Sequence, residues 1–561
     1  MIRLLFAPFS ILLWVLLSPL RALRRARAAP KGALLEANLQ GHVLEGPLRP
    51  ERWSFFARRR ASAPTSLVAV RRLVDLALCD PRVSGLLVRV ERFTAGWATA
   101  AALRAELARL RAAGKRTVAY LPEGGGNVEM LVATGCETLI APPVVDIAPV
   151  GPRATGVFLH DLLDQAGVDV ELLARKEFKS AGDRLARQSR SEPDRLQTEA
   201  LIGAFDGALV AAIAEGRQLT VEEAKAARDL GPTRAKVAVE RKLLDRVAHD
   251  DELPAALGDP KLGSAARYLR AKRSHPFPVR FRRRVIGVVQ VHGTITDDAP
   301  MVGGFGRMAV AKQVVADLRA ATLDPRVAGV VLDIDSPGGT VTGSDAIFAA
   351  VRRLAKDKPV VARMGDVAAS GGYYVAMAAR SVIAHPLTIT GSIGVVSLRP
   401  VLARLAARFG VARDAIHLGR FADLESLLRA PTDEERALLD REIDGHYAEF
   451  VELVAASRKR SLEEIEPLCR GRVYTGEAAH GLGLVDALGG FTDAVAKVRA
   501  EVGPVDDEPV VIVGKHPSPR PPTPKVAALL PELPGFSALV PWLAMLESRA
   551  RVVALEPFDV R

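Results

Sequence analysis

The stretch Asp80-Pro-Arg-Val-Ser-Gly-Leu-Leu-Val88 returns later in the chain as Asp324-Pro-Arg-Val-Ala-Gly-Val-Val-Leu332, 244 positions further on. Ile140-Ala-Pro-Pro143 returns in the same way as Ile383-Ala-His-Pro386, at an offset of 243. An offset that stays nearly constant between residues 80 and 143 indicates a duplication and not a chance match. The fold is therefore expected to be one structural unit used twice.

The second copy shows most clearly what this unit is. Apolar runs at Val285–Val291, Val327–Ile334 and Pro359–Arg363 predict strands, and Val310–Ala321 and Ser344–Ala355 predict the helices between them. The strands are continuously apolar instead of alternating, which is typical of a parallel sheet covered by helices on both faces. The sequence therefore predicts an α/β protein.

The repeat register divides the chain into five segments. These are 1–32, a membrane anchor with a basic flank; 33–255, the first repeat; 256–283, a basic linker; 284–503, the second repeat; and 504–561, a Pro-rich segment with an apolar tail.

The chain begins with an apolar run, Leu4–Leu20, that carries no charge. Its length is at the lower limit for crossing a bilayer. A signal peptide cleaved near Ala26-Arg27-Ala28 is the alternative, but arginines directly before a cleavage site argue against it. We expect an uncleaved anchor. The basic flank after Leu20 would keep the remainder of the chain in the cytoplasm by the positive-inside rule.

The formal net charge is +12, and much of the excess lies in Arg21–Lys31 and Arg267–Arg284. Neither run is interleaved with aromatic residues in the manner of a base-stacking surface. We therefore expect contact with anionic membrane headgroups or a linker role, and no nucleic-acid partner. Cys79, Cys136 and Cys469 lie too far apart in sequence to indicate a disulfide framework or a metal site.

Two glycine-bearing motifs follow successive predicted strands of the second copy. They are Asp335-Ser-Pro-Gly-Gly-Thr340 and Gly365-Asp-Val-Ala-Ala-Ser-Gly-Gly-Tyr-Tyr374. A strand-to-helix turn built from small residues can expose a serine hydroxyl and leave backbone N–H groups free to stabilise an oxyanion. Each motif alone could be a plain tight turn. Together they favour a catalytic site.

With these motifs the sequence resembles signal peptide peptidase A, in its long tandem-repeat bacterial form within peptidase family S49. The resemblance covers about 35–500. The motifs that carry it are Ser336–Gly339, Ala369–Tyr374, Thr390–Gly394, Gly471–Gly476 and Gly483–Asp486. It implies two tandem Clp/crotonase-like repeats, with mostly parallel sheets flanked by helices and an N-terminal membrane anchor.

The resemblance also implies a Ser–Lys dyad. Ser370 would be the nucleophile and Lys179, within Phe178-Lys-Ser-Ala181, the base. Ser392 would orient the lysine by a hydrogen bond. Lys176 is the alternative base, because the motif continues here in a way that departs from the family pattern.

By the same likeness, Gly339 and Gly371 would supply the N–H groups of an oxyanion hole, and Gly338 would keep the turn open. The implied enzyme is a serine endopeptidase that degrades cleaved signal peptides or similar apolar peptides through an acyl-enzyme, without metal or cofactor. It would be a homo-oligomer, a tetramer or larger ring, at the inner membrane. Its body would be periplasmic, with the cytoplasmic side as the alternative.

The repeat register gives a test that does not depend on the family. Shifting Ser370 back by 243 positions reaches Asn127, so the first copy lacks the nucleophile. Shifting Lys179 forward by 243 reaches Ala422, so the second copy lacks the base. Each copy keeps what the other lacks, which predicts one site per chain. A lysine buried where two domains meet would be held neutral, as a general base must be.

Three alternatives remain on the sequence alone. His385 could serve a Clp-like mechanism, although a loop histidine before a proline favours a structural role. A crotonase-like acyl-CoA enzyme would use the glycine N–H groups but needs no serine–lysine pair. If the protein were a non-catalytic membrane scaffold, the retention of the serine in one copy and the lysine in the other would be accidental.

Overall fold

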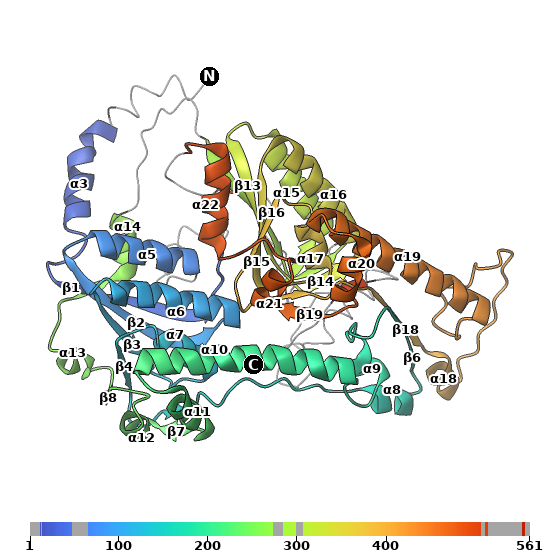
Figure 1. The fold of residues 1–561 in the computed structure, drawn as a ribbon, viewed down its shortest axis with the longest axis horizontal. Helices are drawn as coiled ribbons and strands as arrows, with labels where there is room; N and C mark the ends of the chain where they lie inside the picture. The colour runs from blue at the N-terminus through green and yellow to red at the C-terminus, as the bar shows by residue number, and fades with distance from the viewer. Residues whose placement is uncertain are drawn as a thin grey trace. The chain divides into compact units, whose positions relative to one another are not determined.

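The computed structural model describes residues 12, 14–47, 66–272, 284–298, 307–505, 511–513 and 553–555. The chain forms two compact units (Figure 1). The first takes in Met1–Pro152, Phe205–Val285 and Pro504–Val510, and the second takes in Arg153–Ala204, Ile286–Gly503 and Val511–Arg561.

The first unit is built on a six-stranded sheet in the order β8-β4-β3-β2-β1-β9, and every pair in it is parallel. Its strands are β1 (Ala33–His42), β2 (Val83–Thr94), β3 (Arg116–Tyr120), β4 (Thr138–Ala141), β8 (Arg246–Val247) and β9 (Leu262–Ser264). A small antiparallel pair joins β5 (Asp146–Ile147) to β7 (Thr233–Arg234). The helices that lie wholly in this unit are α3 (Ser18–Ala26), α5 (Leu67–Cys79), α6 (Trp97–Ala112), α7 (Asn127–Ala133), α11 (Val221–Asp229), α12 (Ala235–Glu240), α13 (Leu253–Ala256) and α14 (Ala265–Ala271).

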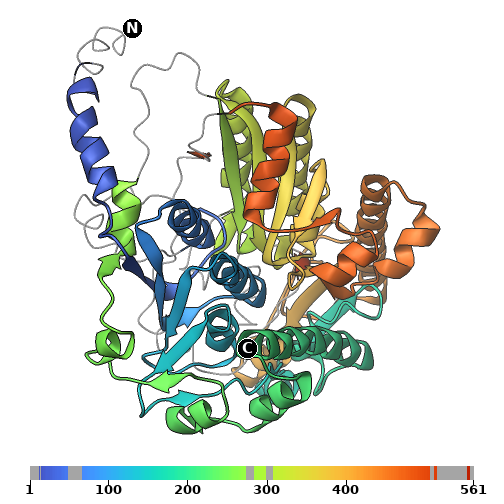
Figure 2. The same cartoon turned by 60° about the vertical axis from the view of Figure 1, so that its left-hand side comes forward.

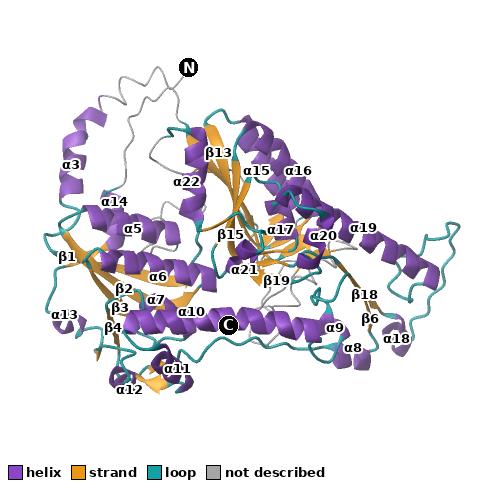
Figure 3. Ribbon diagram, viewed as in Figure 1, coloured by secondary structure: helices purple, strands orange, loops and turns teal. Residues whose placement is uncertain are grey.

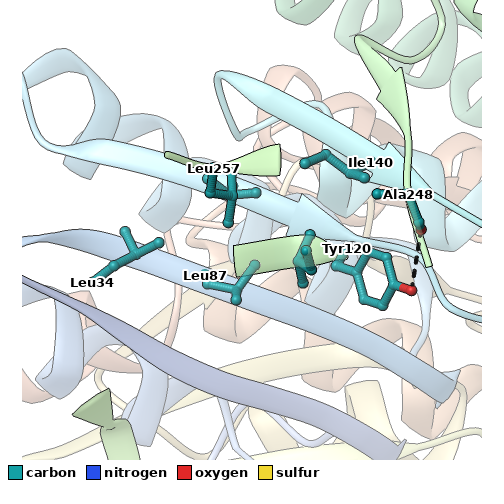
Figure 4. Close-up of a cluster of buried hydrophobic side chains, with 8 residues drawn as sticks. Leu34, Leu87, Tyr120, Ile140, Ala248 and Leu257 are labelled. Atoms are coloured by element: carbon teal, nitrogen blue, oxygen red, sulfur yellow. Dashed lines mark hydrogen bonds between the residues drawn. The ribbon is translucent and has the colours of Figure 1, made fainter. Parts of the chain in front are cut away.

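Side chains from neighbouring strands of this sheet form a buried cluster that includes Leu34, Leu87, Tyr120 and Ile140 (Figure 4). The Tyr120 hydroxyl donates to the carbonyl of Ala248 at 3.4 Å, so the polar end of the ring is satisfied inside the cluster. Parallel strands buried in this way need apolar residues in continuous runs, which is the pattern from which the sheet was predicted.

The second unit repeats this plan. Its main sheet has the order β19-β17-β15-β13-β10-β21; off this path, β16 pairs with β15, and β20 pairs with β16. The strands are β10 (Val285–His292), β13 (Val327–Ser336), β15 (Val360–Ala369), β16 (Ser381–Ala384), β17 (Ile389–Gly391), β19 (Val473–Thr475), β20 (Ala487–Leu488) and β21 (Val511–Ile512). The β17–β19 pair is antiparallel, whereas β13–β15, β15–β16 and β15–β17 are parallel.

Helices cover both faces of this sheet. α15 (Ala311–Leu323) and α16 (Val341–Asp357) pack together on one face, and α22 (Phe491–Val502) packs on β13 and β15 from the other (Figure 2). β2 and β13 begin at Val83 and Val327, and α5 and α15 follow the same offset, so the duplication read from the sequence is a duplication of elements. The predicted α/β repeat with mostly parallel sheets flanked by helices is confirmed.

A second sheet in this unit has the order β12-β11-β14-β22-β18-β6 (Figure 3 shows the strands in orange). Its strands are β6 (Asp169–Ala174), β11 (Thr294–Thr296), β12 (Met308–Val310), β14 (Gly338–Thr340), β18 (Val396–Val401) and β22 (Val553–Leu555). The other elements of the unit are α8 (His160–Ala166), α9 (Asp183–Ala186), α17 (Gly371–Ala376), α18 (Ala403–Arg408), α19 (Asp433–Arg458), α20 (Leu462–Ile465), the 3₁₀ helix Glu466–Leu468 and α21 (Gly476–Gly481). α10 (Glu192–Arg217) begins in the second unit and ends in the first.

Among the described residues, α10 is the helix long and apolar enough to cross a membrane by length and composition, and 44% of its most apolar window is buried in the protein. A shorter apolar helix covers Trp14–Leu23. Most of the predicted anchor Leu4–Leu20 lies outside the described residues, as do much of the basic linker and nearly all of the Pro-rich tail.

Candidate active site

Ser370 stands at the end of β15, directly before α17, and its side chain is fully buried. Its backbone has φ 54° and ψ −115°, a positive-φ conformation that is strained for a residue with a side chain. The Ser370 N–H donates to the carbonyl of Gly391 on β17 at 2.8 Å, which holds the turn in place. Non-glycine residues in this conformation cluster at functional sites.

Lys179 reaches this serine from the loop between β6 and α9, and it is 2% exposed. Its Nζ donates to Ser370 Oγ at 2.9 Å, to Ser392 Oγ at 2.7 Å and to the Ser392 carbonyl at 3.2 Å. Ser392 follows β17 and also has a positive φ, of 51°. The structure thus brings together the three side chains that the sequence named as nucleophile, base and orienting residue.

Both dyad candidates lie in the second compact unit. Residues 153–204, which the repeat register assigns to the first copy, pack with 286–503. The reason is the antiparallel pairing of β6 with β18, from Asp169↔Val401 to Ala174↔Val396, which ends just before the lysine loop. The lysine is therefore presented by a strand of the same unit that holds the serine.

Two glycines pack closely against Lys179. A Cβ on Gly471 would lie 2.6 Å from Cβ of Lys179, and one on Gly394 would lie 3.3 Å from its Cδ. Gly471 also has φ 78°, where a side chain is disfavoured. Both glycines belong to the motifs identified in the sequence, but no local pattern there indicates that they pack on the lysine.

Gln197, at the start of α10, fixes the lysine loop and was missed by the sequence analysis. Its Nε2 donates to the carbonyl of Phe178 at 3.2 Å and to Ser180 Oγ at 3.0 Å, and its Oε1 accepts from the N–H of Val473 at 3.2 Å. The side chain is 1% exposed, so these bonds form out of water. An isolated glutamine on a helix offers no sequence signal for such a role.

The three glycines proposed for an oxyanion hole lie in two segments of the chain, one before the serine in sequence and one directly after it. Gly338 and Gly339 are in β14, which follows β13, and Gly371 is the first residue of α17. Gly338 has φ 105° and its N–H donates to Ser336 Oγ at 3.2 Å. A Cβ on Gly339 would lie 1.9 Å from the carbonyl oxygen of Ile295 on β11, so close strand pairing also requires glycine there.

The two alternative bases are engaged elsewhere. Lys176 forms an ion pair with Glu466 at 3.2 Å, and its side chain is 41% exposed. His385 lies in the loop after β16, where its Nδ1 accepts from the N–H of Leu387 at 3.2 Å. Burial lowers the pKa of His385 to about 4. Among the described residues, no group of three or more His, Cys, Asp or Glu side chains is arranged to hold a metal ion.

In the first unit, the position that corresponds to the nucleophile holds an asparagine. Asn127, which the register pairs with Ser370, donates from Nδ2 to the carbonyl of Gly151 at 2.8 Å and accepts at Oδ1 from the Gly151 N–H at 2.9 Å. The same 243-residue shift pairs Gly151 with Gly394, whose carbonyl lies 3.5 Å from Ser370 Oγ. The contact is thus kept in both units while its chemistry differs.

Comparisons with known proteins match both copies of the duplicated unit. The family model described as "Peptidase family S49" matches residues 109–260 and 352–504, once in each repeat, and the Clp protease model matches 300–388. The chloroplastic serine protease SPPA of Arabidopsis thaliana is 28% identical over 87% of this chain and 72% of its own length.

Two bacterial proteins named Protease 4 are similar over nearly the whole chain. That of Salmonella typhi is 29% identical over 94% of this chain and 87% of its own length, and that of Haemophilus influenzae is 25% identical over 90% and 85%. The S49 model covers more than half of the chain, with one match in each copy of the duplicated α/β unit. The chain therefore belongs to peptidase family S49 and is a serine peptidase.

Proposed function

We propose that this chain is a serine endopeptidase in which Ser370 is the nucleophile and Lys179 is the general base. The observation that carries the proposal is the 2.9 Å contact between Lys179 Nζ and Ser370 Oγ, with both side chains almost completely buried. That distance is within reach for direct proton transfer.

The chemistry follows from the surroundings of the amine. A serine hydroxyl is a weak nucleophile until a base takes its proton. Burial disfavours the ammonium form of a lysine, because the charge loses its hydration. The neutral Lys179 amine would accept the Ser370 proton as Oγ attacks the peptide carbonyl carbon. It would then return the proton to the leaving amine, and water would hydrolyse the resulting ester.

Backbone N–H groups of Gly339 and Gly371 would stabilise the oxyanion of the tetrahedral intermediate. Gly338 supports this role indirectly, because its φ of 105° shapes the turn that presents Gly339. Ser392 would orient Lys179 through the two oxygens that Nζ contacts, at 2.7 and 3.2 Å.

The substrate class is proposed from the second sheet. β22 (Val553–Leu555) lies between β14 and β18 and is antiparallel to both, with Gly339 opposite Ala554 and Val396 opposite Val553. The space beside Gly339 therefore accepts an extended backbone as an added strand, which is a common way to bind peptides. We propose apolar peptides, cleaved signal peptides among them, as the substrates.

We also propose a cellular setting for the protein. The apolar N-terminal segment would hold the chain at the inner membrane, with its body on the periplasmic side. Subunits would assemble into a tetramer or larger ring. Proteolysis of intact spheroplasts tests the orientation: a body cut by external protease supports the periplasmic side, and a protected one contradicts it.

The test of the catalytic proposal is labelling of the full-length protein with a fluorophosphonate probe. Wild type should be modified at Ser370, whereas Ser370→Ala and Lys179→Ala should show no labelling. Lys176→Ala is the matched control, since it removes a lysine three residues away that pairs with Glu466, and it should label normally. Labelling that survives in Lys179→Ala would refute the dyad. Absence of labelling in folded wild type would favour an acyl-CoA enzyme or a non-catalytic scaffold instead.

A further inference from the structure

The strand that carries Ser370 contains an irregularity shortly before the serine. In the parallel pairing of β13 with β15, Ile334 lies opposite Met364, but Ser336 lies opposite Ala368. Asp335 alone therefore faces the segment Gly365–Val367. Such bulges bend a strand and redirect the residues after it, and they are frequent next to active sites.

The Asp335 side chain fills this bulge. Its Oδ1 accepts from the N–H of Val367 at 3.2 Å. A Cβ on Gly365 would lie 2.9 Å from Cβ, Cγ and Oδ1 of Asp335, so the carboxyl fits only because residue 365 is glycine. The Asp335 carbonyl also accepts from the N–H of Gly293 at 2.8 Å, which ties the same residue to the end of β10.

The bulge is also the point where β15 changes its partner on the other side. Met364 pairs with Ala384 of β16, while Val367 pairs with Ile389 of β17. Thr388 fixes the change by donating from Oγ1 to the Gly365 carbonyl at 2.7 Å. After the bulge the new register leads to the Ser370 N–H bond with Gly391, one residue before Ser392.

Asp335 belongs to a group of charged side chains on β10, β13 and β15. His292 Nε2 and Arg363 Nη1 each lie 2.9 Å from a carboxylate oxygen of Asp333. Burial, then the charge of Asp366, raises the pKa of Asp335 to about 6, while His292 acts in the opposite sense and Asp333 adds to the rise. His385, which follows β16, and Arg363 both interact electrostatically with Asp366.

We propose that Asp335 is a positioning residue for the nucleophile. Its carboxylate holds the Val367 amide and so fixes the register in which β15 delivers Ser370 to Lys179 and Ser392. Because Asp335 directly precedes Ser336-Pro337-Gly338, it also joins the nucleophile strand to the turn that leads to Gly339. The inference rests on the proposed function.

The test uses purified full-length protein and an internally quenched peptide, with Asp335→Ala and Asp335→Asn. Misplacing a reacting group by about 1 Å can cost about 100-fold in rate, so Asp335→Ala should lower kcat by tenfold or more while KM changes less than twofold. Asp335→Asn keeps an acceptor oxygen but loses the charge, and a hydrogen bond to a neutral acceptor is about half as strong, so this variant should recover only part of kcat at pH 8. Asp324→Asn is the matched control. Asp324 lies just before the start of β13, and its Oδ1 accepts from the backbone N–H of Arg326. Its replacement should leave kcat unchanged.

A pH series separates positioning from folding. The carboxylate is present above about pH 6 and protonated below it, so the ratio of wild-type to Asp335→Asn rates should fall towards one between pH 7.5 and 5. Protonation of Lys179 affects both proteins and cancels in this ratio. A flat ratio, or wild-type kcat in Asp335→Ala, would overturn the proposal. If Asp335→Ala does not fold, the Asp335→Asn ratio decides alone. Labelling of wild-type Ser370 reports separately whether the proposed function itself holds.

Discussion

At the scale of single residues, the candidate site depends on glycines that leave room for Lys179 as much as on the side chains that contact its amine. Lys179 is an extended, flexible side chain, yet here its stem is confined between Gly394 and Gly471 and its amine between Ser370 and Ser392. Confinement of this kind fixes a reactive group before substrate arrives and lowers the entropy lost in reaching the transition state.

Gly471→Ala should therefore abolish most activity. The added Cβ would fall 2.6 Å from Lys179 Cβ at a position with φ 78°, so the lysine loop must shift. We expect a loss in kcat of about 100-fold, measured by peptide cleavage. Gly481→Ala is the control, because its Cβ would meet nothing within 4 Å in the neighbouring helix α21. Equal activity of the two variants would contradict the role given to Gly471.

His385 makes a separate prediction about stability. Burial lowers its pKa from 6.5 to about 4, so the folded protein favours the neutral ring. Above pH 6.5 the ring is neutral in both the folded and the unfolded state. As the pH falls from 6.5 to 4, the unfolded state takes up a proton that the folded state does not, so the free energy of unfolding falls by about 2 kcal/mol after allowing for partial exposure. Chemical denaturation at pH 7 and pH 4.5 should show wild type losing more stability than His385→Asn, in which the amide oxygen can still accept from Leu387. Parallel losses in the two proteins would rule this contribution out.

At the scale of secondary structure, the second sheet links the turn at the candidate site to a strand near the C-terminal end of the chain. β14 carries Gly338 and Gly339, and one of its edges pairs with β22, near α17. A peptide substrate that binds by strand addition to this edge of β14 must take the place that β22 occupies.

Ending the chain before Val553 should therefore improve substrate binding. We expect KM for a peptide substrate to fall several-fold with little change in kcat, because β22 no longer competes for β14. A chain that ends after Leu555 keeps the strand and serves as the control. Steady-state kinetics of both truncated proteins decide the point: the same KM in both would mean that β22 does not compete with substrate.

At the scale of the whole molecule, the duplicated units differ at the candidate site: the second unit has the Ser370–Gly394 contact, and the first has an Asn127–Gly151 contact in its place. In the first unit, Asn127 and Gly151 bond each other in both directions at the place where the second unit has Ser370 and Gly394. The position that corresponds to Lys179 is Ala422, which cannot act as a base.

The chain should therefore carry a single reactive serine. Intact-mass measurement after exhaustive fluorophosphonate treatment should show one adduct per chain, and none in Ser370→Ala. Asn127→Ser should not add a second adduct in the wild-type background, since no lysine occupies the matching loop position, Ala422. A second adduct at position 127 of that variant would show that the first unit can still activate a nucleophile.

Much of this was accessible from the amino-acid sequence. The offset between Asp80–Val88 and Asp324–Leu332 established the duplication, and the continuous apolar runs established parallel strands between helices, because such patterns are local and repeat along the chain. The pairing of Ser370 with Lys179 followed from what each copy had lost, together with the family resemblance.

Tertiary structure alone decided how that pair is held. It grouped residues 153–204 with the second unit, placed Gly471 and Gln197 against the lysine loop, and set Asp335 in the bulge before Ser370. Lys179 and Ser370 are 191 positions apart, and contacts over such separations depend on close packing between elements that no local pattern records. Local pattern thus determined the elements and the candidate residues, and long-range packing determined the distances on which their chemistry depends.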